Sequence, residues 1–426
     1  MDIPYQDINS RTIDRWVGEG WEWGKPISHE EYERAQAGTW DVKLTPVKFV
    51  PHDWLGDLKG KRVLGGVGWE FVERLVAAGA GQVELPKGHV SFDPEYYKLL
   101  AQRMVLEAGV ELYTNTVVSA CQMADGRVTH VLIESKDGLQ ALAAGTVIDA
   151  TGDGLVCRRA GVPMQVSAGG MQPMSLCFLL RNVDVTTALL RDHIHHTGLH
   201  GQSKHMGIYH ALQKLAEQGE DVPQFGGPWF NSTMQEDLIC VNITRAAANA
   251  ADRAQLTQAE CRMREDAYKL VALLRKLYPE FAKASIAEIA AQGGVRETYH
   301  IRGLYTLSGA DILGGAPCAD GVAFCSHPVD IHSAQDNTQT AQYFDTPCPV
   351  PYRVMVAAGF DNLIAAGRCV SCVDEAYASM RVQGTCMAIG EAAGVAAAMR
   401  RETGCAVTAV NTDALRARLQ KQGAIV

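Results

Sequence analysis

Three short runs between residues 116 and 143 alternate apolar with polar side chains. The runs cover 116–123, 128–135 and 139–143, and the pairs Asp125-Gly126 and Asp137-Gly138 separate them. Alternation with a period of two residues is typical of strands that bury one face, and Asp-Gly is a frequent hairpin turn. The pattern therefore predicts a three-stranded antiparallel meander.

Helical spacing of apolar residues occurs on both sides of this meander. Asp93 can cap a helix that starts at Pro94 and ends at Gly109, because aspartate accepts free amide protons and proline fits the first turn. A short strand is expected over 110–113, directly after this helix, and another over 61–64. The same periodicity predicts further helices over 30–37, 69–78, 258–277 and 382–399.

Two buried strands are predicted to end in small residues. Residues 145–149 lead into the segment 150–154, ATGDG, and residues 362–366 lead into Gly367. Ligands of open α/β sheets bind beyond the carboxyl ends of parallel strands, where glycine lets the backbone approach them closely. The turns therefore indicate contact with a dinucleotide, and ordinary strand-closing turns are the alternative.

The helix that opens after Arg381 carries Gly390, Gly394 and Ala398 on one face. Such a face packs closely on a sheet or on a cofactor, and the free amides of a helix N-terminus favour negative charge. A close-packed helix without a ligand is the alternative.

Composition narrows the class of protein. The 426 residues are 47% hydrophobic and 20% charged, with a net charge of −9, which is typical of a globular protein and gives no attraction to nucleic acid. The sequence contains no apolar run of about 18 residues that could span a membrane. The 12 cysteines have no regular spacing, and the first residues show no targeting pattern. We therefore expect a cytoplasmic protein with free thiols.

Tryptophan and cysteine are unevenly distributed along the chain. Six of the seven tryptophans lie within the first 69 residues, and every cysteine lies at Cys121 or later. This segregation indicates two sequence histories with a boundary near 61–68, and chance distribution of a few residues is the alternative.

Seven segments occur in this order: WEFVERLVAAG, SFDPEYYKLLAQRMVLEAGVELYTNTVV, VIDATGDG, GGVRETYHIRGLYTLSGADIL, HPVDIH, NLIAAGRCVS and ASMRVQGTCMAIGEAAGVAAA. Together they resemble the FAD-dependent oxidoreductases of the glutathione-reductase-like flavoprotein fold, which have succinate dehydrogenase and fumarate reductase flavoproteins as distant relatives. The resemblance implies an α/β fold with FAD as the cofactor. It implies an FAD-binding domain, residues 67–165 and 345–426, with an inserted α+β cap or substrate domain, residues 166–344.

The resemblance also implies which residues contact the cofactor and the substrate. Those on the cofactor are Val117 or Val118 near the adenine, Ala150, Thr151 and Gly152 near the pyrophosphate, Gly367 and Arg368 near the ribityl chain, and Arg381 and Val382 near the isoalloxazine ring. Those on the substrate side, the candidate catalytic residues, are Arg296, His300, Arg302 and His332. These basic groups can bind a carboxylate or relay a proton, and structural ion pairs or core histidines are the alternative.

The chain departs from this family at its beginning. Members start with a strand, a GxGxxG turn and a helix that holds the FAD pyrophosphate, and no GxGxxG occurs in this sequence. Residues 11–65 instead resemble the N-terminus of a class I S-adenosylmethionine-dependent methyltransferase. We expect a hybrid chain in which a methyltransferase-like leader, residues 1–66, replaces the first Rossmann unit, which leaves FAD occupancy in question. A lesser alternative is a substitute unit with Gly66 and Gly68 in the turn and Glu84 as the acidic residue.

The expected function is that of an FAD-dependent oxidoreductase, which transfers a hydride between the flavin and a small organic substrate. A fragment of an S-adenosylmethionine-dependent methyltransferase is one alternative, and an inactive or partner-dependent flavoprotein remnant is another. The expected partners are the small-molecule substrate and either a second copy of the chain or a complementing subunit, but neither nucleic acid nor a membrane.

Two further motifs are assigned structural roles. Cys369 and Cys372 have the CxxC spacing of redox dithiols, but the chain has no second CxxC to complete a zinc site, so a buried structural pair is favoured. The histidines between His193 and His210 have no regular ligand spacing and are expected in a solvated loop. No metal site is predicted.

Overall fold

The computed structural model describes the backbone of residues 43–45 and 48–49, and residues 64–84, 89–187, 189–190, 205–235, 238–315 and 318–426. The chain divides into two compact units, Met1–Arg62 and Val63–Val426. The described elements of the first unit are two antiparallel strands, β1 (Lys43–Thr45) and β2 (Lys48–Phe49). The helix predicted over 30–37 and most of the strand predicted over 61–64 lie outside the described residues.

The second unit begins with two helices and a strand pair. Its first elements are α4 (Gly66–Ala77), β3 (Gly81–Glu84), β4 (His89–Phe92) and α5 (Pro94–Glu107). As predicted, Asp93 caps α5, because its carboxylate accepts the amide protons of Glu95 and Tyr96 at 2.8 and 3.0 Å. Phe71 of α4 and Leu100 of α5 are buried in one apolar cluster, which joins the two helices.

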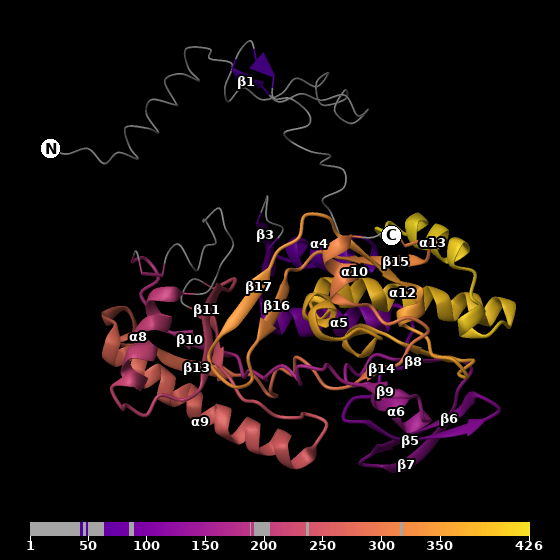
Figure 1. Ribbon diagram of the computed structural model, residues 1–426, viewed down its shortest axis with the longest axis horizontal. Coiled ribbons are helices and arrows are strands. Elements are labelled where there is room, and N and C mark those ends of the chain that lie inside the picture. Colours follow the sequence, from indigo (N-terminus) through magenta and orange to yellow (C-terminus); the bar gives the residue numbers. More distant parts are fainter. Residues whose placement is uncertain are drawn as a thin grey trace. The chain divides into compact units, whose positions relative to one another are not determined.

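The predicted meander is confirmed. Its strands are β5 (Val117–Ala124), β6 (Arg127–Ser135) and β7 (Gly138–Ala143), antiparallel in the order β5-β6-β7. Gly126 and Gly138 adopt positive φ angles of 73° and 103° in the two turns, a backbone region that favours glycine. The short helix α6 (Leu155–Ala160) lies over this sheet and contacts β5 (Figure 1).

A parallel strand pair joins two segments that are far apart in the sequence. β8 (Val147–Asp149) pairs with β19 (Leu363–Ala365), with Val147 opposite Leu363 and Asp149 opposite Ala365. The elements after β19 are η4 (Gly367–Cys369), α11 (Asp374–Met380), α12 (Gln383–Thr403), η5 (Val407–Ala409) and α13 (Thr412–Lys421). α12 packs against both strands and against α13, its neighbour in Figure 1. Apolar side chains of these elements form one large buried cluster.

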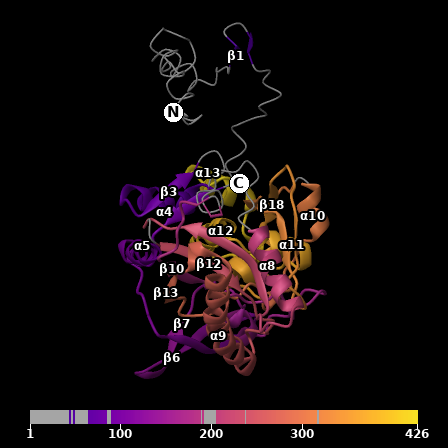
Figure 2. The same cartoon turned by 90° about the vertical axis from the view of Figure 1, so that its left-hand side faces the viewer.

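A four-stranded antiparallel sheet is separate from the parallel pair. Its strands are β10 (Phe178–Arg181), β11 (Phe225–Ser232), β12 (Leu238–Thr244) and β13 (Ser285–Ile289), in the order β11-β12-β10-β13. The helices that pack on it are α8 (Met206–Glu217), against β11, and α9 (Arg253–Leu277), against β12 and β13 (Figures 1 and 2). Leu180, Phe225 and Leu270 are fully buried between these elements.

The remaining elements are short. Three antiparallel pairs are β9 (Met164–Gln165) with β14 (His300–Ile301), β15 (Gly321–Cys325) with β18 (Cys348–Pro351), and β16 (Val329–His332) with β17 (Gln339–Gln342). The short helices are η2 (Pro279–Phe281), α10 (Gly309–Gly314) and η3 (Tyr352–Val354). Within the described ranges, no helix is both long and apolar enough to cross a membrane.

The prediction of a strand over 110–113 is wrong. These residues form irregular chain, and the side chains of Val110, Leu112 and Tyr113 are 51%, 44% and 53% exposed. A strand exists only with a pairing partner, and the described residues provide none for this segment. The prediction for Cys369 and Cys372 is confirmed, since both are fully buried and neither forms a disulfide. The other cysteines are also free thiols, and their exposure ranges from buried to exposed.

Candidate functional site

The loops after the two parallel strands meet at the carboxyl edge of the pair. The carboxylate of Asp149, fully buried, accepts hydrogen bonds from the Thr151 amide at 3.1 Å, the Thr151 hydroxyl at 2.7 Å and the Cys157 amide at 2.8 Å. Gly152 follows with a φ of 78°, and a methyl group at its Cα would collide with the Arg368 guanidinium. The structure therefore brings together the residues predicted at 150–152 and 367–368.

The two valines predicted near the adenine lie on β5, next to the helix that follows this loop. The Arg159 guanidinium of α6 donates to the Ser119 carbonyl, and the Cys121 thiol donates to the Val156 carbonyl at 3.8 Å. Val118 packs against the large buried cluster, whereas the Val117 side chain is 60% exposed.

The second edge of β8 has no neighbour among the described strands. In the parallel pair, Val147 and Asp149 direct their backbone groups at β19, so those of Ile148 face the other side. The side chain of Ile148 is 36% exposed, although it belongs to the central strand motif of the predicted family. The open edge and the exposed apolar side chains of 110–113 both belong to the second unit.

The substitute dinucleotide unit is ruled out by its geometry. β3, which would have to be a parallel strand, pairs antiparallel with β4. At the start of α4, the amide of Gly66 donates to the Gly423 carbonyl at 2.9 Å and the amide of Val67 donates to the Glu391 carboxylate at 3.1 Å. A negative side chain therefore already occupies the helix N-terminus at which a phosphate would bind.

The junction between α11 and α12 holds the two residues predicted beside the isoalloxazine ring. Val382 is the N-cap of α12, and no side chain caps that helix. The guanidinium of Arg381 donates to the Asp330 carboxylate at 2.8 Å and to the Asp330 carbonyl at 3.0 Å. The junction therefore connects the N-terminus of α12 to β16.

Five residues around this contact form a buried, mainly cationic cluster, which we call the arginine site: Arg245, Arg296, Asp330, His332 and Arg381. Arg245 is 1% exposed, and the side chains of Asp330 and Arg381 are 15% and 13% exposed. Arg296 donates to the Pro173 carbonyl at 2.7 Å and to the Ser175 hydroxyl at 2.8 Å. Desolvation and the charges of Arg381 and Arg245 lower the pKa of Arg296 to about 10.

Hydrogen bonds fix the tautomer of His332. Its Nδ1 lies 3.1 Å from Nη2 of Arg245, which can only donate, and its Nε2 lies 2.9 Å from the Asp330 carboxylate. Nε2 therefore carries the proton and both ring nitrogens are engaged. Burial lowers the pKa of His332 to about 4 despite the Asp330 charge, so the ring is neutral at pH 7. Burial alone would raise the pKa of Asp330, but the His332 hydrogen bond and the Arg381 charge together lower it well below its usual range.

The other two predicted substrate-side residues lie outside the arginine site. His300 is fully buried, with Nε2 at 3.3 Å from the Glu297 carboxylate and its ring edge-on to Tyr377 at a centroid distance of 4.4 Å. His300 Nδ1 and the Tyr377 hydroxyl are buried and have no hydrogen-bond partner in the described part of the chain. Arg302 is exposed and donates to the Met164 carbonyl at 3.4 Å.

Sequence reasoning missed Arg245 and Asp330. Asp330 and His332 lie two residues apart in the HPVDIH segment, and strand side chains at that spacing point to the same face. This spacing could have identified Asp330 from the sequence. Arg245 directly follows the apolar strand β12, and only the fold brings it to His332.

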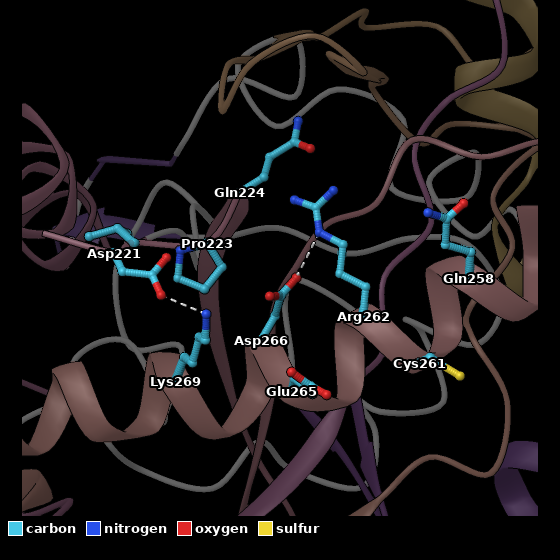
Figure 3. A pocket seen from close by; sticks show the side chains of 10 residues that line it. Asp221, Pro223, Gln224, Gln258, Cys261, Arg262, Glu265, Asp266 and Lys269 are labelled. Atoms are coloured by element: carbon cyan, nitrogen blue, oxygen red, sulfur yellow. Dashed lines mark hydrogen bonds and ion pairs between the residues drawn. The ribbon is translucent and has the colours of Figure 1, made fainter. Parts of the chain in front are cut away.

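A separate pocket of about 550 Å³ lies along α9 (Figure 3). Four of its charged groups form two ion pairs: Lys269 with Asp221 at 2.6 Å, and Arg262 with Asp266 at 3.4 Å. The pocket contains no predicted site residue, and we assign it no role. No group of three or more potential metal ligands occurs among the described residues. His193–His200 lie outside them, and the prediction of a solvated loop is wrong for His205, which caps α8 and is buried, and for His210, which lies within that helix.

The parallel pair with small-residue loops at its carboxyl edge, beside a buried cationic site, defines an α/β protein of the nucleotide-binding type. The chain belongs to the FAD dependent oxidoreductase family, whose model matches residues 41–419. The cofactor of this family is FAD, and its members are enzymes.

A stretch of 97 residues is 33% identical to an uncharacterized methyltransferase, YbaJ, of Bacillus subtilis (strain 168). The match covers 22% of this chain, which spans only 37% of the length of that relative.

Two of the solved structures that the chain resembles are the following. The flavin-dependent halogenase CmlS matches with a TM-score of 0.41 and 13% identity, over 84% of this chain and 54% of that one. A geranylgeranyl bacteriochlorophyll reductase-like protein from Thermoplasma acidophilum matches with a TM-score of 0.35 and 12% identity, over 81% of this chain and 67% of that one.

The described residues fit one part of FAD and not another. The uncapped N-terminus of α12 would stabilise negative charge on a flavin ring, and Val117, predicted near the adenine, has exposed apolar surface. Ala150 and Thr151, predicted near the pyrophosphate, are also exposed. The pyrophosphate normally binds the N-terminus of the helix after the first strand. Among the described helices none follows a strand beside β8, and the N-terminus of α4 is filled by Glu391.

Proposed function

We propose that this protein is an oxidoreductase that transfers a hydride between FAD and a small organic substrate bound at the arginine site. The observation that supports this most directly is the α11–α12 junction. It places Arg381, part of the arginine site, next to the uncapped helix N-terminus at Val382. Bound FAD would supply a two-electron acceptor or donor there.

The chain's own residues would bind the substrate and move its proton. Arg245 and Arg296 would hold an anionic group, because guanidinium groups donate paired hydrogen bonds to carboxylates. We assign the proton transfer to His332, the histidine within the arginine site, whose Nδ1 would accept from the substrate once an anionic group occupies the Arg245 guanidinium. His300 lies outside that site, fully buried against Glu297, and we assign it no proton transfer.

We further propose the domain organisation expected from the sequence. The leader, residues 1–66, would replace the first Rossmann unit, the FAD-binding domain would comprise 67–165 and 345–426, and 166–344 would form the cap. The open edge of β8 and the exposed apolar side chains at 110–113 support this, since a strand and a helix in the usual place would cover both. The free cysteines agree with a reducing cytoplasm.

The same open edge favours a second candidate, a partner-dependent flavoprotein. A separate polypeptide would then supply the missing strand and helix. The methyltransferase alternative rests on the leader alone.

The absorption spectrum of the purified chain, before and after incubation with FAD, tests these proposals. Bound flavin that a substrate reduces under anaerobic conditions would support the oxidoreductase. A colourless protein with no thermal shift on adding FAD would contradict it for the chain alone. Flavin binding that needs a second polypeptide would support the partner-dependent form, and calorimetric binding of S-adenosylmethionine would support the methyltransferase.

A further inference from the structure

We propose that the arginine site binds a small organic dianion, a molecule with two negative charges within a few ångströms of each other. As a statement about the substrate class, this rests on the proposed function. Binding itself does not require flavin, so it can be measured separately.

The first argument is the balance of charge. Three guanidinium groups surround one carboxylate, and His332 is neutral at pH 7 because burial lowers its pKa to about 4. The five residues therefore carry an excess of two positive charges. Charges removed from water are costly unless opposite charges compensate them. Among the described residues no carboxylate forms an ion pair with Arg245 or Arg296, and the exposed Asp336 acts on Arg245 only as a nearby charge.

The second argument is the state of the hydrogen-bond donors. Arg245 donates to neutral acceptors, the carbonyls of Asp336 and Thr338 at 3.2 and 3.0 Å and the ring of His332. Its Nε is buried and has no partner within the described structure, and the same is true of Nε of Arg381. Gln339, whose amide nitrogen donates to Asp330, has a buried Oε1 that also has no partner there. Buried polar atoms in proteins are nearly always bonded, so these atoms indicate a site built for a ligand.

The third argument concerns access and size. Arg381 and Asp330 keep part of their surface exposed and mark the side from which a solute would enter, whereas Arg245 is 1% exposed and lies deeper. The Trp229 ring lies edge-on to the His332 ring at a centroid distance of 5.5 Å and forms an apolar wall. Neither Arg296 nor Arg245 has a carboxylate partner, so one anionic group would bind Arg296 and a second would bind Arg245. Two carboxylates on a short carbon frame, or one phosphate, supply this charge.

Calorimetry and thermal shift on the full chain test the proposal, with malonate, inorganic phosphate and acetate as probes at constant ionic strength. Malonate, phosphate or both should bind saturably at pH 7 and raise Tm, and acetate should bind at least about tenfold more weakly. A preference for malonate over phosphate would identify a dicarboxylate, and the reverse would identify a phosphate group. Equal binding of acetate, or no saturable binding of any probe, would overturn the proposal.

Variants locate the binding. Arg245→Met and Arg296→Met should each weaken dianion binding at least about tenfold. Arg264→Met is the matched control, because Arg264 pairs with Glu260 on α9 at 3.2 Å, outside the site, and it should bind like the parent. If a methionine variant fails to fold, Arg296→Lys retains the charge but not the guanidinium fork and should bind with intermediate strength. Unchanged binding in folded variants of both arginines would overturn the assignment. Dianion binding by a chain that takes up no FAD would contradict the proposed function but not this inference.

Discussion

Arg381, at the end of α11, donates a hydrogen bond of 2.8 Å to the carboxylate of Asp330 on β16. The same carboxylate accepts from His332 at 2.9 Å, so a single acidic side chain holds two basic ones in place. Asp330 is thus the centre of the arginine site, and its removal has consequences for stability as well as for binding.

Asp330→Asn should lower the free energy of unfolding by about 3 kcal/mol, because it leaves Arg381 without a counter-charge in a buried place. Urea denaturation measures this change. Glu402→Gln is the control, since Glu402 forms a surface pair with Arg418 at 2.6 Å and its loss should change stability little. Equal effects of the two substitutions would show that the Asp330 pair behaves like a surface pair.

Stability should fall as the pH drops from about 6.5 to about 4. Burial lowers the pKa of His332 from 6.5 to about 4, so in this window the unfolded chain binds a proton that the folded chain does not. The neutral His332 ring therefore contributes about 3 kcal/mol to the free energy of unfolding above pH 6.5, and this contribution is lost as the pH approaches 4. Urea denaturation of the parent and of His332→Gln across this range checks it, and the variant should show a flatter profile. Parallel profiles would contradict the assignment.

Ile148→Thr should cost less than about 0.5 kcal/mol, because the open edge of β8 leaves this side chain 36% exposed. Ile364 lies directly opposite in the parallel register and is fully buried, so Ile364→Thr should cost about 2–3 kcal/mol. Comparison of the two unfolding free energies tests the open edge. A large cost at Ile148 would show that another segment covers it in solution.

Gly152→Ala should destabilise the loop after β8 for two reasons. Its φ of 78° is unfavourable for alanine, by about 1 kcal/mol, and the new methyl group would displace the Arg368 guanidinium, which lies 3.6 Å from the Asp153 carboxylate. Gly161→Ala is the control, because Gly161 has a φ of 86° but no atom within 4 Å of the added carbon, so it reports the backbone effect alone. Adding Arg368→Ala to Gly152→Ala should remove the excess cost. An excess that remains would point to a different neighbour.

Local sequence patterns were enough to predict the elements that depend on residues close together in the sequence. Asp93 and Pro94 define the start of α5, and the Asp-Gly pairs define the meander, because caps and hairpin turns are short-range interactions. The segment 110–113 has strand-like alternation but forms irregular chain, since pairing depends on a partner that the described residues do not contain.

The candidate site was predicted only in part for a related reason. Arg296 and His332 were recognised from segments that resemble a family, whereas Arg245 reaches His332 only because β12 and β16 approach each other in the fold. The engagement of both His332 nitrogens likewise depends on tertiary contacts that no motif encodes.

The hydrogen bond from the Gly66 amide to the Gly423 carbonyl joins the beginning of the second unit to its last residues. The ends of this unit are therefore adjacent, which is the geometric condition for circular permutation. A short linker from residue 426 to residue 63, with new ends opened at the exposed turn of Asp137 and Gly138, would preserve the described contacts. Such a permuted chain would release the second unit from the leader and leave the start of α4 anchored.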